Sequence, residues 1–256
     1  MKATGNSMNK QIMILASVIT GLTIATVLAQ PGPCGGMMGG GPSGPQFGGD
    51  MVKIFGDNSA FSATLEIHTT GGPSGNEIVM PGKIAFSSGK SRFEMDMAEA
   101  KGANMPPQAI EHMKQMGMDR TVVISLPDKK INYMIYPGAQ AYVENPIQDA
   151  NAAKSPDDFK MEVTKLGEEK IDNHDCIKNK VVVTDKDGKS QEFTVWNATD
   201  LKKFPVKFEF AKNGSSMIML YKDVKLEKPD AAEFEPPTDY TKYNSVMEMM
   251  MTRMRH

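Results

Sequence analysis

Few of the residue types on which most catalytic and metal sites depend are present in this sequence. Its 256 residues include two cysteines, four histidines and one tryptophan. It also lacks Gly-x-Ser-x-Gly, a glycine-rich phosphate loop, His-Glu-x-x-His and Cys-x-x-Cys, which position nucleophiles, phosphates and metals in many enzymes. The 29 basic and 31 acidic residues nearly cancel, so no strong field attracts nucleic acid or anionic lipid. We therefore expect a protein that is not an enzyme, uses no cofactor and binds no nucleic acid.

An apolar run near the N-terminus, residues 12–29, follows Lys10. A basic start, an apolar middle and short side chains at Val27 and Ala29 are typical of a cleavable secretory signal. Threonines and a glycine interrupt the run, which makes it a poor permanent membrane span. We expect a signal peptide over residues 1–29 and a soluble exported protein, periplasmic or extracellular, with no stable membrane span after cleavage.

Residues 30–50 are rich in glycine, proline and methionine. Such a segment cannot bury enough apolar surface to offset the entropy of ordering it, so we expect a disordered tether. It contains Cys34, which in an exported chain could form a disulfide with Cys176. The sequence leaves open whether the two are paired. The prolines directly before Cys34 do not fit the lipidation signal of bacterial lipoproteins.

After the tether, apolar and polar residues alternate, as in strands with one buried face. Phe61, Ala63, Leu65 and Ile67 show this alternation clearly. We predict a single domain, residues 51–256, that is mainly β (α+β): a curved antiparallel sheet or open half-barrel with a few short covering helices. The expected elements are strands at 61–69, 78–86, 92–97, 121–126, 131–136, 140–143, 161–166, 176–184, 190–196, 204–210 and 216–226, a short helix at 106–115 and a methionine-rich helix at 239–254.

Large apolar residues on one side of many strands, with little helix to cover them, allow two interpretations. The sheet curves around an apolar cavity, or its side chains fill a solid core. The residues expected on the concave face, and so the candidates for lining a cavity, are Leu65, Ile67, Ile84, Phe93, Met95, Phe193, Val195 and Phe208.

Methionine is abundant, with 22 residues, and several lie close together near the C-terminus. Thioethers are soft ligands that suit cuprous copper, but methionine also fills gaps in apolar cores. The alternative metal ligands are Met247, Met250, Met251 and Met254. The same stripe could instead pack on the sheet or bind a partner protein in the cell envelope.

His174 and Cys176 are the remaining candidates for chemistry. A histidine close to a cysteine can activate a thiolate or supply two metal ligands. No third ligand is evident, so the pattern favours a turn followed by an inward-facing cysteine at the start of a strand.

A further pattern is spread over five segments and two tyrosines: 167–176, 189–192, 195–201, 204–207 and 234–237, with Tyr240 and Tyr243. Together these segments resemble the exported bacterial family catalogued as domain of unknown function 4412. Its members have a His-x-Cys turn, a strand that ends in tryptophan and a terminal methionine-rich helix. Asn173 departs from the glycine expected in that turn.

The resemblance implies a distant similarity to the fold of periplasmic lipoprotein carriers, an open antiparallel barrel closed by helices around an apolar cavity. We therefore predict an exported, non-enzymatic binding protein with an apolar cavity for a lipid, an acyl chain or a lipidated protein. A cuprous copper-binding protein and a structural envelope protein that binds a partner through its terminal helix are the alternatives. The sequence identifies neither the ligand nor the oligomeric state.

Overall fold

The computed structural model describes residues 49–70, 77–102, 106–147, 156–212 and 215–254. The predicted signal peptide, Cys34 and all of the predicted tether except its last two residues lie outside these ranges. No helix in the described ranges is long and apolar enough to cross a membrane.

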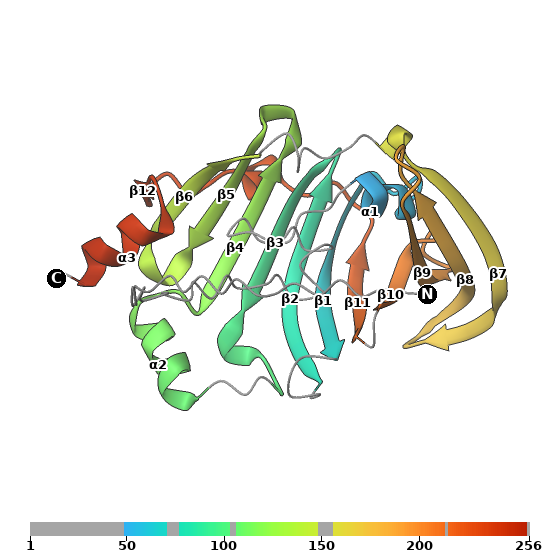
Figure 1. The fold of residues 1–256 in the computed structure, drawn as a ribbon, viewed down its shortest axis with the longest axis horizontal. Coiled ribbons are helices and arrows are strands. Elements are labelled where there is room, and N and C mark those ends of the chain that lie inside the picture. The colour runs from blue at the N-terminus through green and yellow to red at the C-terminus, as the bar shows by residue number, and fades with distance from the viewer. Residues whose placement is uncertain (1–48, 71–76, 103–105, 148–155, 213–214, 255–256) are drawn as a thin grey trace, which may run out of the picture. The chain divides into compact units, whose positions relative to one another are not determined.

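A single twelve-stranded sheet dominates the described chain, in the order β12-β6-β5-β4-β3-β2-β1-β11-β10-β9-β8-β7 (Figure 1). Neighbouring strands are antiparallel except β12 and β6, which are parallel. Because β12 and β7 are two separate edges, the sheet is open. The predicted fold class, mainly β with an open curved sheet, is confirmed. The strands are β1 (Ala60–Thr70), β2 (Ile78–Ser87), β3 (Lys90–Asp96), β4 (Arg120–Leu126), β5 (Ile131–Tyr136), β6 (Ala141–Pro146), β7 (Lys160–Ile171), β8 (His174–Thr184), β9 (Ser190–Ala198), β10 (Pro205–Lys212), β11 (Ser215–Lys225) and β12 (Thr241–Tyr243).

The helices are few and short, as predicted. They are α1 (Gly49–Ile54), α2 (Pro107–Gln115) and α3 (Val246–Met254), with 3₁₀ turns η1 (Met97–Glu99), η2 (Pro127–Lys129), η3 (Pro137–Ala139), η5 (Pro156–Asp158) and η6 (Ala231–Phe234). Proline opens α2, where its missing N–H costs nothing. No residue of α2 is buried, so this helix contributes nothing to the core.

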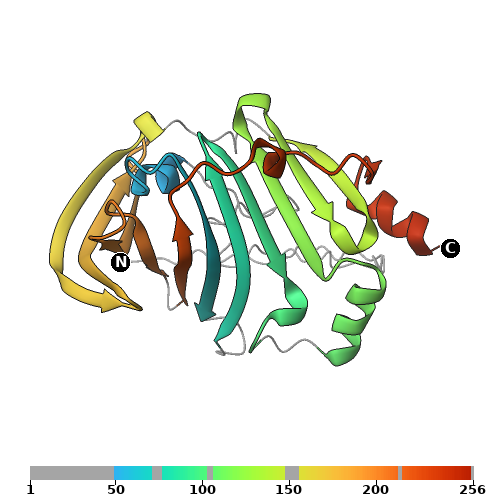
Figure 2. The same ribbon diagram turned by 180° about the vertical axis from the view of Figure 1, so that it is seen from behind.

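One face of the sheet is concave, and the apolar contacts show it. Phe93 of β3 and Val181 of β8 belong to one buried cluster, although β2, β1, β11, β10 and β9 separate their strands in the sheet. The cluster runs along one face of the seven strands from β3 to β8, and Figures 1 and 2 show that the sheet is curved. Phe61, Leu65 and Ile67 of β1 lie in the same cluster and identify this concave face.

The opposite, convex face is partly covered by the segment 226–240, which we call the strap. Figure 2 shows the strap crossing the strands between the end of β11 and β12. Phe234 of the strap is buried against Ala85, Val122 and Ile124, which alternate with the concave-face residues of their strands. The two faces of the central strands are therefore both apolar, but different segments cover them.

The predicted C-terminal helix begins later than expected. Residues 241–243 form β12, where Thr241 N–H donates to the Gln140 carbonyl oxygen at 2.9 Å, and the helix starts only at Val246. Ser245 Oγ accepts from Glu248 N–H at 3.1 Å, and Glu248 accepts from Asn244 N–H at 2.9 Å. This is close to a capping box, which fixes where a helix starts.

Candidate binding face

The concave face has two ends that differ in composition. At the end formed by α1, β1, β2, β10 and β11, six aromatic rings contact one another. Phe61 lies 4.7 Å from Phe55 and 4.8 Å from Phe204, measured between ring centroids. The members of this aromatic cluster are Phe55, Phe61, Phe86, Phe204, Phe208 and Tyr221. Their mutual contacts make this end a packed core supplied by the chain itself.

The aromatic cluster also buries one polar atom without a partner. The Tyr221 hydroxyl has no hydrogen-bond partner, and burial raises the pKa of this phenol far above its ordinary value. Its ring contacts Phe55 and Phe208, so its apolar body accounts for its position in the core.

At the other end, β3 to β6 place twelve side chains on the concave face, and none of them is charged. Their pairing registers define this set, because residues directly opposite one another in a sheet share a face. Phe93, Val123, Met134 and Val143 form one row across the four strands. The others are Ser91 and Met95 of β3, Thr121 and Ser125 of β4, Asn132 and Tyr136 of β5, and Ala141 and Asn145 of β6.

Little helix from the described ranges covers this end. Met249 of α3 is fully buried against Met134, Tyr136 and Ala141, and Val246 packs beside it. The helix spans nine residues and lies beside β5 and β6 in Figure 1. Within the described chain, α3 is the helix that packs on this surface, and most of these side chains are already buried: Phe93, Val123 and Val143 are at most 2% exposed.

A polar row crosses the same four strands next to this apolar surface. Ser91, Ser125, Asn132 and Asn145 pair in that order from β3 to β6. Asn132 is completely buried, yet neither its Nδ2 nor its Oδ1 has a hydrogen-bond partner, and Asn145 Nδ2 is likewise buried and unpaired. We call these four residues the polar row.

All eight residues predicted for the concave face lie in one apolar cluster with Phe61. Seven are buried, and Met95 is half-buried. Their positions differ along the face. Phe208 belongs to the aromatic cluster, the ring of Phe193 is tilted against that of Phe210 with centroids 5.6 Å apart, and Phe93 and Met95 lie beside β4. Contact among them is established, whereas a role in lining a ligand cavity stays a prediction.

The sequence analysis did not identify the polar row. Asn145 lay beyond the predicted strand, which stopped at 143, whereas β6 continues to Pro146. Asn132 lies in a correctly predicted strand and alternates with Met134 and Tyr136, which places it on the apolar face. The sequence did contain one indication, because a polar residue, Asn132, occupies a position that alternation assigns to the buried face.

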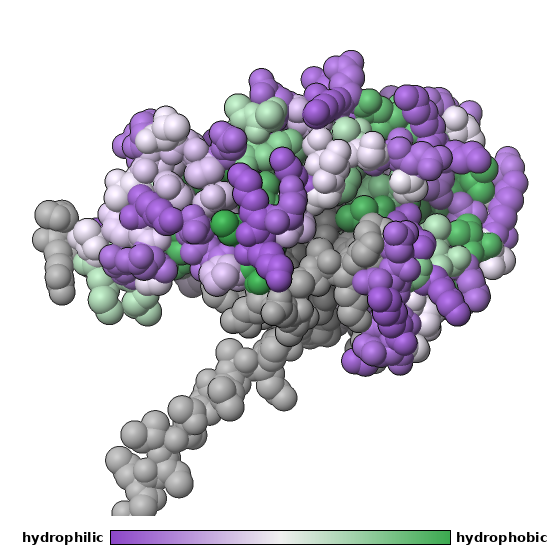
Figure 3. Space-filling model, turned by 90° about the horizontal axis from the view of Figure 1, so that it is seen from above, coloured by the Kyte–Doolittle hydropathy of each residue, from purple (hydrophilic) through white to green (hydrophobic). Residues whose placement is uncertain are grey.

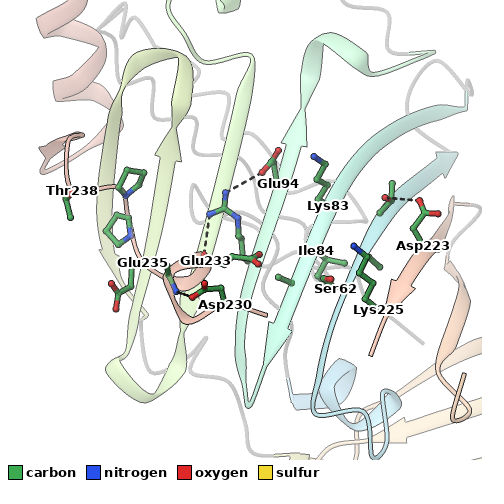
Figure 4. A pocket seen from close by; sticks show the side chains of 17 residues that line it. Ser62, Lys83, Ile84, Glu94, Asp223, Lys225, Asp230, Glu233, Glu235 and Thr238 are labelled. Atoms are coloured by element: carbon green, nitrogen blue, oxygen red, sulfur yellow. Dashed lines mark hydrogen bonds and ion pairs between the residues drawn. The ribbon is translucent and has the colours of Figure 1, made fainter. Parts of the chain in front are cut away.

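A hollow of about 860 Å³ on the convex face is the main alternative site among the described residues. It lies between the strap and β1 to β3, as Figure 4 shows. Arg92 reaches both Glu94, at 3.4 Å, and the Glu233 carbonyl oxygen, at 3.3 Å. Its lining includes eight charged residues, so it does not suit an apolar ligand: Lys83, Arg92, Glu94, Asp223, Lys225, Asp230, Glu233 and Glu235.

Residues 61–204, more than half of the chain, match the family model described as a domain of unknown function, DUF4412. The chain belongs to this family. The resemblance predicted from the His-x-Cys turn and the strand that ends in tryptophan is therefore confirmed. Among curated proteins, none matches the sequence.

Solved structures resemble this DUF4412 chain at low identity. They include a LolA superfamily protein from Nitrosomonas europaea (14% identity, 73% of this chain, 94% of that chain, TM-score 0.33). The lipoprotein LppX from Mycobacterium tuberculosis (11%, 68%, 92%, 0.40) and LprF from Mycobacterium bovis (14%, 73%, 96%, 0.40) are two others. The predicted distant similarity to the lipoprotein-carrier fold is confirmed as a likeness of this kind. TM-scores of 0.40 and below support no conclusion about a ligand.

The His-x-Cys turn of this DUF4412 protein is a structural feature. His174 Nδ1 lies 2.8 Å from Asp200 Oδ2, so the ring interacts with this carboxylate. Cys176 is a buried free thiol that donates to the His174 carbonyl oxygen at 3.4 Å, and burial raises the pKa of the Cys176 thiol. A raised pKa disfavours the reactive thiolate, so the pair is not arranged for nucleophilic chemistry.

The methionine stripe of α3 divides between buried and exposed side chains. Met249 is buried, whereas Met247 and Met251 are 60% and 51% exposed and lie one turn apart on the helix. Met250 is half-buried, and the side chain of Met254 lies outside the described part. The residue that packs on the sheet is thus Met249, which the predicted stripe did not include.

Proposed function

We propose that this protein is an exported, non-enzymatic binding protein that holds an apolar ligand, such as a lipid, an acyl chain or a lipidated partner, against the β3–β6 end of its concave face. One observation supports this most strongly. Twelve uncharged side chains on four strands face inward, and a single fully buried methionine from α3 packs on them among the described residues.

The hydrophobic effect is sufficient for such binding. Burying one CH2 group contributes about 0.8 kcal/mol, so an acyl chain with ten buried CH2 groups gains about 8 kcal/mol. That corresponds to a dissociation constant of order 1 μM before the entropy costs of binding are subtracted. The four strands span about 14 Å at the usual spacing, which is wide enough for a chain to lie across them.

Native mass spectrometry of the protein purified from its own exported compartment tests the proposal. We expect a bound mass that organic solvent extracts and that is identified as a lipid or an acylated molecule. Recovery of empty protein that also fails to bind a twelve-carbon acyl probe would overturn it.

Three charge insertions locate the site: two on the concave face and one control on the convex face. Met95→Lys and Thr121→Lys place an ammonium group on the concave face at half-buried positions, whereas Thr64→Lys places one at an exposed position of the convex face. We expect the first two to weaken binding of the acyl probe at least tenfold and the third to leave it unchanged. Circular dichroism confirms that each variant is folded. Equal effects from all three would contradict the assignment to the concave face.

A cuprous copper site on α3 is the second candidate. The observation that favours it is that Met247 and Met251 expose their side chains one helical turn apart. Soft thioethers suit Cu(I), but two of them do not complete a site. Titration of the protein with Cu(I) under reducing conditions tests it, and stoichiometric uptake that is lost when α3 is deleted would support copper.

A further inference from the structure

The polar row does not fit a simple apolar surface. A buried amide without partners costs about 1–3 kcal/mol, and folded proteins rarely leave such groups unpaired. Asn132 leaves both ends of its amide unpaired, and Asn145 leaves its Nδ2 unpaired on the neighbouring strand. The two asparagines are directly opposite each other in the sheet, so their amides are directed to the same side.

Asn179 shows what the same sheet does with a buried asparagine that has only a structural role. It lies in β8 and donates to the Ile177 carbonyl oxygen at 3.3 Å and to Asn197 Oδ1 at 2.9 Å. Asn179 is thus satisfied by the chain itself, whereas Asn132 is even more deeply buried and is not. The described chain therefore supplies partners for Asn179 but none for Asn132.

The chemistry of the row restricts which ligand group could pair with Asn132. An asparagine amide offers two N–H donors and one carbonyl acceptor, and serine adds a hydroxyl that can do either. None of the twelve concave-face residues of β3 to β6 is charged. A carboxylate or phosphate would therefore be buried there without a cation, which is costly. A neutral group with both a donor and an acceptor fits best.

The neighbouring row is apolar. Phe93, Val123, Met134 and Val143 lie two residues from the polar row on each strand, a step of about 7 Å in the same direction across the antiparallel strands. A ligand that lies along this direction would place its polar group on one row and its hydrocarbon on the next. An acyl chain linked to an amide has this layout.

We propose that the polar row is a subsite for the amide of an acyl amide, with Asn132 Oδ1 accepting from the ligand N–H and Asn145 Nδ2 donating to its carbonyl oxygen, because the N–H and C=O of a trans amide point in opposite directions. This assignment rests on the proposed function, because it concerns the head of the ligand whose chain occupies the apolar rows. It names the ligand class as N-acyl compounds rather than fatty acids or phospholipids.

Three probes with the same twelve-carbon chain test the proposal. N-methyldodecanamide has a donor and an acceptor, N,N-dimethyldodecanamide has only the acceptor, and dodecanoate at pH 8 is charged. The full chain is titrated with each probe by isothermal calorimetry. We expect N-methyldodecanamide to bind about tenfold more tightly than the other two, since one or two hydrogen bonds distinguish them. The extra methyl of the dimethyl probe favours burial, so hydrophobicity alone predicts the opposite order.

Two leucine variants separate the subsite from general effects. Asn132→Leu should remove the preference for N-methyldodecanamide while binding of the dimethyl probe is kept. Asn179→Leu, the matched control in β8, should preserve the preference among the probes. Thermal denaturation verifies that both variants fold at the titration temperature.

The outcomes distinguish the subsite from the binding face. Equal binding of all probes, unchanged in Asn132→Leu, would overturn the polar row as a subsite and leave the apolar binding face intact. Tightest binding of dodecanoate would also overturn it, in favour of a charged head group. Binding of none of the probes would overturn the proposed function and the subsite together.

Discussion

The two ends of the concave face belong to the same sheet, but they satisfy their buried side chains differently. At the aromatic cluster, Phe55, which directly follows α1, contacts rings from four other segments of the described chain. At the β3–β6 end, α3 contributes Met249, and two asparagine amides stay unpaired. The rings of the first end pack on one another and leave one buried hydroxyl, that of Tyr221, without a partner, whereas the second end leaves two neighbouring amides unpaired. A buried apolar face is therefore not by itself a core.

The largest expected effect tests whether the aromatic cluster carries the stability. Phe61→Ala should lower the free energy of unfolding by about 3–5 kcal/mol, because it removes a ring that contacts four others and leaves a cavity. Val123→Ala, on the concave face of β4, should cost about 1.5 kcal/mol, the value of two CH2 groups. Urea denaturation measures both. A loss for Val123→Ala well above the value of its two methyl groups would show that the β3–β6 end is packed as tightly as the aromatic cluster.

The next effect compares the two buried asparagines in the absence of ligand. Asn179→Leu should lower the free energy of unfolding by about 1–2 kcal/mol, because it removes two hydrogen bonds. Asn132→Leu should be neutral or stabilising, because the amide it replaces has no partner to lose. The measurement is again the urea midpoint of each variant. A large loss in Asn132→Leu would mean that the polar row is structural.

The sheet could be predicted from sequence because its signal is local. Alternation of period two marked most of the strands, and turn residues such as Asp187-Gly188 and Ser88-Gly89 marked the hairpins between them. The extent of β7 was underestimated. It continues past the predicted end at 166 to Ile171, and nearly all its side chains are exposed, so no burial pattern was present to follow.

Strand β7 also shows why sequence alternation is a poor guide at the edge of a sheet. Met161, Val163 and Leu166 are among the most exposed large apolar residues of the described chain, and hydrophobic side chains appear at the end of the molecule where β7 lies (Figure 3). An edge strand pairs on one side only, so its sequence is less constrained than that of a central strand.

The candidate site was harder to predict than the fold because it depends on register between strands. The alternation of apolar and polar residues was enough to predict that Phe93 and Phe193 face the concave side. The meeting of Asn132 and Asn145 was not, since it requires the pairing of β5 with β6 and a strand end two residues later than the pattern indicated. Lack of a partner for Asn132 is a three-dimensional fact that no local pattern contains.

A smaller effect uses pH to separate the convex side of β1 from ligand binding at the β3–β6 end. On the convex side of β1, His68 lies 2.6 Å from Glu66 and 2.8 Å from Glu77, and Lys222 donates to Glu66 at 2.9 Å. Burial lowers the pKa of His68, but the hydrogen bonds to Glu77 and Glu66 outweigh it, so the pKa is raised above 6.5. The pKa of Glu66 is lowered below 4.5 by its hydrogen bonds to His68 and then Lys222.

The signs of the two shifts define the expected pH profile. The contribution of His68 is fully present below pH 6.5 and is lost as pH rises through its raised pKa. The contribution of Glu66 is present above pH 4.5 and is lost as pH falls through its lowered pKa. Stability should therefore decline modestly between about pH 6 and pH 8, by less than about 1 kcal/mol because these groups are partly exposed. His68→Gln should flatten this decline.

Ligand binding at the β3–β6 end should not follow that profile. Its concave-face residues carry no charge, so the affinity for N-methyldodecanamide should be constant from pH 6 to pH 8 in both the parent protein and His68→Gln. An affinity that fell in step with the His68 titration would show that the convex side of β1 and the β3–β6 end are coupled.

The smallest effect concerns the outer surface of α3. Replacing Met247 and Met251 together with leucine should change the free energy of unfolding by less than about 0.5 kcal/mol, because both side chains are largely exposed. Met249→Leu, the matched change on the buried side of the same helix, should cost up to about 1.5 kcal/mol. If the double variant keeps acyl binding, α3 acts at this end only through Met249. If instead it abolishes stoichiometric Cu(I) uptake by the parent protein, the exposed methionines are metal ligands, and α3 has a function separate from the concave face.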